Sequence, residues 1–337
     1  MIYPDFIKPG DVIGVTAPSD GNKKETDFRR LDHGKEALGL YGFPVKETSN
    51  VRISEKGRSA CAKERAREFM ELVEDDAVKA IISAKGGDYL VEMLSLLDFD
   101  VIREHPVWFQ GYSDNTGLTF TITTLCDIAT IYGNNFNDFG MEDWHEAVEN
   151  NFEILRGSQV KQTSFDFYED GFYDKATGLE GYTLTEPVNW VNARGEETLS
   201  VSGRLLGGCL DVLLNLCGTK YDKVKEFNAK YEEDGILWYL ESFALNSEAL
   251  TIGLWHLKEA GWFDTAKGFV FGRPCFYESE VGTSYQEAVL SVLGELNVPI
   301  ILEADIGHKA PQFTVINGAM GIFQSAGGRG TFVQQYK

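Results

Sequence analysis

Residues 107–120 read VWFQGYSDNTGLTF and combine three local signals. The apolar run Val107–Gln110 predicts a short buried strand, and Gly111 predicts a sharp turn directly after it. Thr116–Cys126 has the pattern of a helix that begins as soon as the turn ends. This order places Ser113 at the carboxyl end of a strand, where a hydroxyl group can stand exposed above a sheet.

Strands and helices alternate on both sides of this stretch. We expect strands at Asp11–Ala17, Pro44–Glu47, Val78–Ser83, Val107–Gln110 and Ala129–Tyr132, and helices at Thr26–Tyr41, Ala62–Val73, Tyr89–Leu97 and Thr116–Cys126. Such alternation predicts an α/β fold with a mostly parallel sheet covered by helices on both faces. Ligands on such sheets gather beyond the carboxyl ends of the strands. The turns at Gly86-Gly87 and at Ser113 both lie at such ends, so we expect a site there.

The regular pattern loosens between residues 156 and 200, which predicts a crossover between two domains. Alternation then resumes, with helices expected at Leu210–Leu216, Ser247–Ala260 and Tyr285–Leu293 and strands at Gly235–Leu240, Gly268–Phe271 and Pro299–Leu302. The glycine-rich end, Thr314–Phe332, is typical of β-hairpins. We therefore expect one domain at 1–155, a crossover at 156–200 and a second α/β domain with a β-rich end at 201–337. The chain length of 337 residues also favours two cores.

The charge balance excludes two classes of partner. The chain has 52 acidic and 31 basic residues and a net charge of -21. Such a field repels phosphate backbones and anionic lipids, so we expect neither nucleic acid nor a membrane as partner. No stretch reaches the roughly 18 apolar residues of a membrane span, and the N-terminus lacks a basic segment followed by an apolar one. These absences predict a cytoplasmic protein.

The five cysteines predict reduced thiols rather than a disulfide framework or a zinc site. Their number is odd and no C-x-x-C pair occurs. They are Cys61, Cys126, Cys209, Cys217 and Cys275.

Three residues at element ends are the parts that a serine nucleophile requires. A serine hydroxyl is a weak nucleophile at neutral pH and needs a base, usually histidine, that a carboxylate orients. Glu241 directly follows the apolar strand Gly235–Leu240, and His308 is the only histidine in a glycine-flanked turn just past a strand. Ser113 supplies the hydroxyl, and the paired glycines after Lys85 could present main-chain amides to an oxyanion.

Each of these residues also has a structural interpretation. Ser113 could cap the helix that follows it, Glu241 could be an exposed acid at a strand end, and His308 could be an incidental loop residue. Paired glycines often serve backbone geometry alone. Asn115 stands where the G-x-S-x-G motif has its second glycine, so the turn is not the nucleophile turn of α/β-hydrolases.

Taken together, the order of GYSD, a strand-end glutamate and a loop histidine resembles the LD-carboxypeptidase family of serine peptidases. Within that family the chain is most similar to the microcin C immunity peptidase branch. The likeness covers nearly the whole chain. It is carried by KPGDVIGVTAPS at 8–19, ERA at 64–66, VKAIISAKGG at 78–87, LLDFD at 96–100, GYSDNT at 111–116, GRLLGG and LCGT within 203–219, and ADIGH at 304–308.

The resemblance implies a Ser–His–Glu triad of Ser113, His308 and Glu241. It implies an oxyanion hole from the main-chain amides of Asp114 and Gly87. It also implies a flavodoxin-like N-terminal domain, a smaller C-terminal domain, a triad assembled across their cleft and a homodimer. No metal and no organic cofactor are expected.

Substrate contacts are expected from four further residues, namely Lys85, Gly86, Trp190 and Glu278. Trp190 resembles an aromatic residue that the immunity branch uses to stack on a nucleobase. Three departures from the family pattern concern substrate contacts: Lys85 replaces a common Arg, Cys209 a common Asn, and Val107-Trp108 a Lys-containing stretch.

Two substrates follow from the resemblance. The first is an aminoacyl-nucleotide of the microcin C type, whose amide link the enzyme would cut in self-immunity or detoxification. The alternative is the L,D-peptide bond of cytoplasmic murein tetrapeptide. A function of another class, binding of a small ligand without turnover, is also compatible with an α/β protein that has a cleft.

Overall fold

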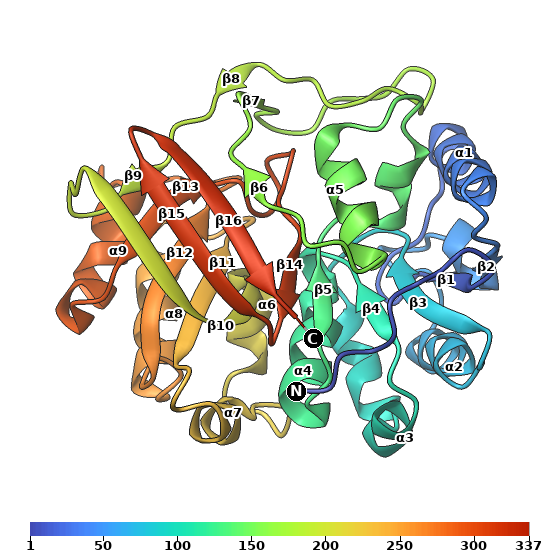
Figure 1. The fold of residues 1–337 in the computed structure, drawn as a ribbon, viewed down its shortest axis with the longest axis horizontal. Helices are drawn as coiled ribbons and strands as arrows, with labels where there is room; N and C mark the ends of the chain where they lie inside the picture. Colours follow the sequence, from blue (N-terminus) through green and yellow to red (C-terminus); the bar gives the residue numbers. More distant parts are fainter. Residues whose placement is uncertain (337) are drawn as a thin grey trace.

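The computed structural model describes residues 1–336, whose first β-sheet has six strands in the order β14-β5-β4-β3-β1-β2 (Figure 1). These strands are β1 (Val12–Thr16), β2 (Val45–Glu47), β3 (Val78–Ser83), β4 (Trp108–Gln110), β5 (Thr130–Tyr132) and β14 (Val315–Asn317). Strands β1 to β5 pair in parallel, whereas β14 runs antiparallel to β5. The order 2-1-3-4-5 is that of flavodoxin-like sheets, so the predicted α/β class and the flavodoxin-like N-terminal fold are confirmed.

Helices connect the strands of this sheet. They are α1 (Glu25–Leu40), α2 (Ala62–Val73), α3 (Phe99–Glu104), α4 (Thr116–Cys126) and α5 (Glu146–Leu155), with 3-10 helices η1 (Ser49–Arg52), η2 (Leu90–Leu96), η3 (Ser113–Asn115) and η4 (Phe136–Gly140). Helix α2 forms because its apolar side chains recur at helical spacing and bury one face, including Phe69 and Leu72. The helix expected at 89–97 is instead the 3-10 helix η2. The backbone becomes extended at Leu97, and Asp98 then caps a separate helix, α3.

The second sheet has eight strands in the order β6-β16-β15-β10-β11-β12-β13-β9. They are β6 (Gln162–Thr163), β9 (Val191–Asn192), β10 (Thr198–Cys209), β11 (Ile236–Glu241), β12 (Ala266–Gly272), β13 (Ile300–Ala304), β15 (Met320–Ala326) and β16 (Arg329–Gln335). The central strands β10 to β13 are parallel, and the outer strands join them antiparallel. A separate two-stranded pair consists of β7 (Phe167–Tyr168) and β8 (Glu186–Pro187).

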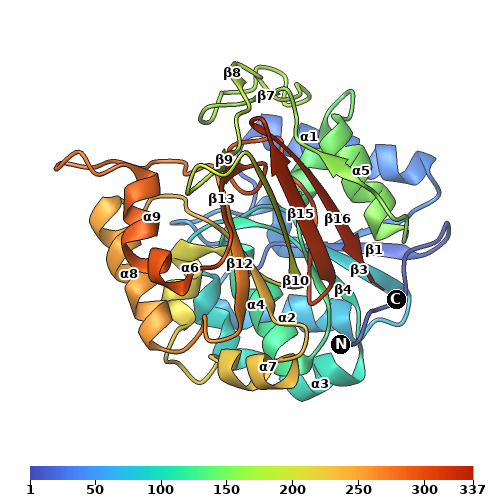
Figure 2. The same cartoon turned by 60° about the vertical axis from the view of Figure 1, so that its left-hand side comes forward.

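Helices cover only part of the second sheet. They are α6 (Leu210–Leu216), α7 (Val224–Lys230), α8 (Ser247–Glu259) and α9 (Tyr285–Leu293), followed by the 3-10 helix η5 (Gly294–Leu296). Figure 2 shows α8 and α9 beside β12 and β13, on the opposite side from β15 and β16. In Figure 1 no helix lies in front of β10, β15 and β16. Within residues 1–336, no helix is both long and apolar enough to span a bilayer.

The chain crosses between the two sheets more often than the predicted boundaries allow. Strand β14, from the last quarter of the chain, joins the first sheet, and β6 and β9, from the expected crossover 156–200, join the second. The boundaries at 155 and 200 therefore do not separate the sheets. The second sheet has eight strands and the first has six, but two of the eight, β6 and β9, come from outside residues 201–337. The cores of the two sheets are continuous: Tyr132 in β5 packs against Tyr239 in β11, with ring centroids 5.6 Å apart.

Candidate active site

Ser113 lies in a turn whose backbone is unusual for a non-glycine residue. The chain leaves β4 at Gln110, turns at Gly111 and enters η3 and α4. Ser113 itself has a φ of 65°, in the left-handed region that β-carbons disfavour. Such strained positions persist only where the surrounding structure holds them, and they gather at functional sites. The turn presents the Ser113 hydroxyl to the cleft rather than to the end of α4, whose N-cap is Asn115.

The structure brings Ser113, His308 and Glu241 together from three distant parts of the chain. His308 Nε2 lies 2.8 Å from Ser113 Oγ, and His308 Nδ1 lies 2.8 Å from Glu241 Oε2. Glu241 is the last residue of β11, and His308 lies in the loop that follows β13. Gly307 makes the approach possible, because a β-carbon there would lie 2.6 Å from Glu241 Cγ.

Glu241 is fully buried yet has the environment of an ionised carboxylate. Burial alone would raise the pKa of its carboxyl group. The charge of His308 and the hydrogen bonds from His308, Tyr132 and Cys209 outweigh burial and hold this pKa below its ordinary value. The carboxylate can therefore accept a hydrogen bond from His308 Nδ1–H, which leaves Nε2 as the acceptor for the serine hydroxyl.

The main-chain N–H groups of Gly87 and Asp114 are free to bind an oxyanion. Neither donates a hydrogen bond to any group within residues 1–336. Gly86 brings the loop after β3 against the nucleophile, because a β-carbon on it would lie 2.9 Å from both Cβ and Oγ of Ser113. Gly87 has no room for a side chain either, because a β-carbon added there would lie 2.3 Å from Ser19 Oγ. Glycine is thus required at both positions for the close approach of these loops.

The Asp114 side chain connects the loops around the nucleophile. It accepts hydrogen bonds from Ser19 Oγ, at 2.5 Å, and from the Leu90 main-chain N–H, at 2.8 Å. Burial raises the pKa of Asp114 above its ordinary value despite these donors and the nearby Arg65. The Asp114 amide was expected from the family resemblance, whereas this role of its carboxylate was not predicted.

A cleft of about 720 Å³ opens above these groups, between loops from both sheets. It is lined by Lys85, Gly86, Gly87, Asp88, Ser113, Asn135, Asp138, Phe172, Cys209, Asp211, Phe243 and His308, among others. Lys85 Nζ lies 3.3 Å from Asp20 Oδ2, so its charge is already paired. Asp211 was not predicted from the sequence. Its carboxylate accepts hydrogen bonds from the Phe243 and Ala244 main-chain N–H groups, at 2.9 Å each, and so holds the segment after β11 that lines the cleft.

Two expected substrate contacts are not in this cleft. Trp190 is only 2% exposed, and its Nε1 donates to Asp305 Oδ2 at 2.9 Å. The predicted stacking role of Trp190 is therefore wrong, because the indole belongs to the core. Glu278 lies exposed in the loop after β12 and does not line the cleft. Of the departures from the family pattern, Lys85 and Cys209 line the cleft, whereas Trp108 is fully buried.

One group of potential metal ligands occurs within residues 1–336. Atoms of Cys209, Glu241 and His308 lie within 4.8 Å of one another. Burial, followed by the charge of Glu241, raises the pKa of the Cys209 thiol well above its ordinary value, so the thiol is protonated and poorly suited to metal binding. The absence of a metal or cofactor from the mechanism stays a prediction.

Comparison with known proteins identifies relatives along the whole chain. Residues 13–133 match the family model for the LD-carboxypeptidase N-terminal domain, and residues 202–322 match that for the C-terminal domain. The chain is 25% identical to a probable murein peptide carboxypeptidase of Bacillus subtilis, covering 96% of this chain and 92% of the relative. It is 26% identical to the microcin C7 self-immunity protein MccF of Escherichia coli, covering 91% and 88%.

Solved structures support the same fold. An MccF-like protein from Bacillus anthracis superposes with a TM-score of 0.82 at 24% identity, covering all of both chains. MccF in complex with glutamyl sulfamoyl guanosine superposes with a TM-score of 0.80 at 22% identity, covering 99% of this chain and 98% of the other.

Proposed function

Because the chain belongs to the LD-carboxypeptidase family of serine peptidases, we propose that Ser113, His308 and Glu241 form its catalytic triad and hydrolyse an amide bond. The observation that carries the proposal is the pair of 2.8 Å contacts that His308 makes with Ser113 and Glu241. Nucleophile, base and orienting carboxylate stand in the order that acyl transfer requires.

Acylation begins when Ser113 Oγ attacks the carbonyl carbon of the substrate and His308 Nε2 accepts the hydroxyl proton. Glu241 accepts the Nδ1–H hydrogen bond and stabilises the imidazolium that forms. The carbonyl oxygen becomes an oxyanion and accepts hydrogen bonds from the Gly87 and Asp114 amides. The C–N bond then breaks as His308 returns the proton to the leaving amine. Water next attacks the acyl-Ser113 ester with His308 again as base, which releases the acid.

The substrate that the cleft fits best is an aminoacyl-nucleotide of the microcin C type. Three aromatic rings stand at the rim: Phe243 lies 4.6 Å from the His308 ring, 5.2 Å from Phe276 and 6.1 Å from Phe172. Phe172 and Phe276 are 59% and 51% exposed, so their rings are accessible to a ligand, and with Phe243 they form an apolar cluster beside the cleft. A planar nucleobase could stack on these rings. Structures of MccF contain aminoacyl sulfamoyl nucleosides, which is consistent with such a ligand.

The charge of the cleft gives little support to a substrate held by an anionic group, which applies to the terminal carboxylate of murein tetrapeptide and to the phosphate of a nucleotide alike, so the aromatic rings carry the choice between them. A carboxypeptidase recognises the free carboxylate of its substrate with cationic side chains. Lys85 is the only lysine or arginine among the residues that line the cleft, and it is paired with Asp20. Asp88, Asp138 and Asp211 line the same space.

Phe172→Ala is expected to separate the two substrates. We expect kcat/KM for an aminoacyl-nucleotide amide to fall about 10-fold, since base–aromatic stacking contributes about 1–3 kcal/mol. Cleavage of murein tetrapeptide should change little, because no stacking ring is needed. Products from the two substrates would be followed by mass spectrometry. Phe167→Ala, which removes a ring that is 48% exposed outside the cleft, is the control. Efficient cleavage of murein tetrapeptide alone would reverse the choice of substrate.

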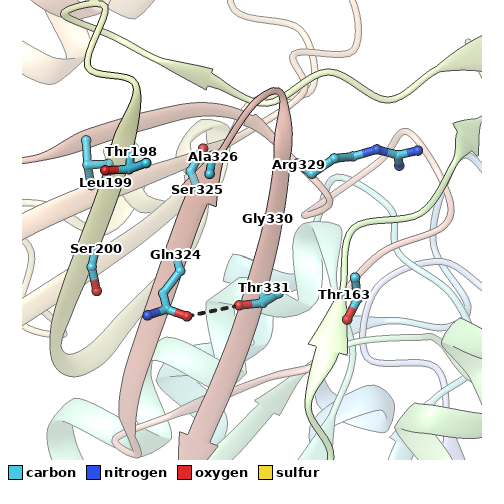
Figure 3. A pocket seen from close by; sticks show the side chains of 10 residues that line it. All are labelled: Thr163, Thr198, Leu199, Ser200, Gln324, Ser325, Ala326, Arg329, Gly330 and Thr331. Atoms are coloured by element: carbon cyan, nitrogen blue, oxygen red, sulfur yellow. Dashed lines mark hydrogen bonds between the residues drawn. The ribbon is translucent and has the colours of Figure 1, made fainter.

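The homodimer expected from the family resemblance is also part of this proposal. Apart from Arg204 and Arg329, which are paired with Asp234 and Asp166, the outward side chains of β10, β15 and β16 carry no charge, in a chain of net charge -21. They are Thr198, Ser200, Ser202, Ile322, Gln324, Ala326, Thr331, Val333 and Gln335. Figure 3 shows Ser200, Gln324 and Thr331 of this face. The Thr331 hydroxyl donates a hydrogen bond to Gln324 Oε1, at 3.5 Å. Two acidic copies can meet there without like-charge repulsion, and charge depletion is typical of interface cores.

Ile322→Lys should convert the dimer to a monomer in sedimentation equilibrium, because each copy would bury a like charge in the proposed interface. Ile252→Lys is the matched control, since Ile252 is 63% exposed on α8, away from this face. A wild-type monomer, or a dimer that survives Ile322→Lys, would refute this interface.

We also propose a cytoplasmic location, which the five free cysteines support and which cell fractionation would test.

A further inference from the structure

Tyr132 contacts both the turn that contains Ser113 and the carboxylate of Glu241. It is the last residue of β5 and is fully buried. Its Oη lies 2.6 Å from Glu241 Oε1 and 3.3 Å from the main-chain nitrogen of Ser113. The tyrosine therefore contacts the turn that follows β4 of the first sheet and the last residue of β11 in the second, and it is not among the residues that line the cleft.

The donors and acceptors around Tyr132 can be arranged in only one way. The Ser113 N–H can only donate, so it uses a lone pair of the phenol oxygen. The single phenol hydrogen is then directed to Glu241 Oε1, which accepts it. Because the other oxygen of the carboxylate also accepts, His308 Nδ1 must carry hydrogen, and Nε2 is left as the acceptor for the Ser113 hydroxyl.

These contacts close a ring of hydrogen bonds that begins and ends at Ser113. It runs from the serine hydroxyl through His308, Glu241 and Tyr132 to the Ser113 N–H. We infer that Tyr132 is a positioning residue, which holds Ser113 in its left-handed conformation and fixes the reactive tautomer of His308 through Glu241. The inference rests on the proposed function, because it assigns a role within that triad.

Burial keeps Tyr132 a hydrogen-bond donor at working pH. Burial and then the charge of Glu241 raise the pKa of its phenol well above the ordinary value. The other titratable groups beside it, Cys209 on β10, Tyr239 on β11 and Tyr112, also have pKa values raised by burial. All three stay neutral, so Glu241 and His308 are the groups whose protonation Tyr132 can influence.

Tyr132→Phe is expected to lower kcat/KM by about 10- to 100-fold, since hydrogen bonds to charged groups are the stronger class. It should also move the acidic limb of the kcat/KM profile to higher pH by about one unit. The sign follows because Glu241, without the phenol donor, holds a proton on the imidazole more strongly. Tyr239→Phe is the matched control: it removes a buried hydroxyl bonded to Asn317 at 2.8 Å, and its profile should match wild type.

A second variant keeps the fold and reverses the sign. Replacing Tyr132 by 3-fluorotyrosine makes the phenol a stronger donor, so the acidic limb should move to lower pH. This variant decides the question if Tyr132→Phe does not fold. An unshifted acidic limb in the folded variants, alongside an inactive Ser113→Ala enzyme, would overturn the role of Tyr132 and leave the proposed function intact. Activity in Ser113→Ala would instead reject the triad itself.

Discussion

Ser113→Ala is expected to lower kcat by on the order of 10⁴–10⁶-fold, the loss typical of removing the nucleophile from a triad. The variant loses the hydroxyl that lies 2.8 Å from His308 Nε2, so the imidazole has lost the nucleophile that it would activate. The fold should persist, because alanine keeps the β-carbon and the Tyr132 contact uses the main chain of residue 113. Amide hydrolysis would be measured on the purified protein, with circular dichroism as the check of folding.

Ser291→Ala, on the exposed face of α9, is the matched control and should retain full activity. A fluorophosphonate probe adds a test that does not depend on the substrate. Wild type and the control should be labelled, whereas Ser113→Ala should not. Hydrolysis at near wild-type rate by Ser113→Ala would contradict the mechanism. If no amide substrate is turned over and the probe labels nothing, the protein would instead be a binding protein without catalysis.

Asp305→Ala is expected to lower the free energy of unfolding by about 3–5 kcal/mol, the cost of breaking a buried ion pair on one side. Asp305 is fully buried, with Oδ1 2.8 Å from Arg273 Nη2 and Oδ2 2.9 Å from Trp190 Nε1. Burial raises the pKa of Asp305 even though Arg273 is beside it, so burying this pair itself costs free energy. The loss in the variant arises because Arg273, only 1% exposed, keeps its charge without the Asp305 carboxylate.

Denaturant unfolding of wild type and Asp305→Ala would measure this effect. Asp166→Ala is the control, because Asp166 pairs with Arg329 at the surface with 78% of its side chain exposed. Such exposed pairs contribute about 0–1 kcal/mol. If Asp305→Ala cost no more than the control, the buried pair would not be holding the loop that leads to His308.

Local pattern predicted many elements at their observed bounds. Helix α2 (Ala62–Val73), strand β3 (Val78–Ser83) and helix α9 (Tyr285–Leu293) match, because each has regular apolar spacing between clear end signals. Strand β10 was missed, because its second half contains Gly207 and Gly208, which weaken a strand pattern. Gly207 is needed there for a tertiary reason: its β-carbon would lie 1.7 Å from the Tyr239 carbonyl oxygen on β11.

Ser113, Glu241 and His308 were singled out from the sequence because each stands at the end of a strand or just past it, and strand ends in α/β sheets lie at binding edges. The alternation of elements and the flavodoxin-like class were visible for the same reason, since apolar periodicity is a local property. What only the tertiary structure decided is which side chains meet. Trp190 was expected at the cleft but lies in the core, and Tyr132 read as an apolar strand residue but contacts the triad. Contacts between distant segments depend on how the two sheets pack against each other, and this packing cannot be predicted from the spacing of residues along the chain.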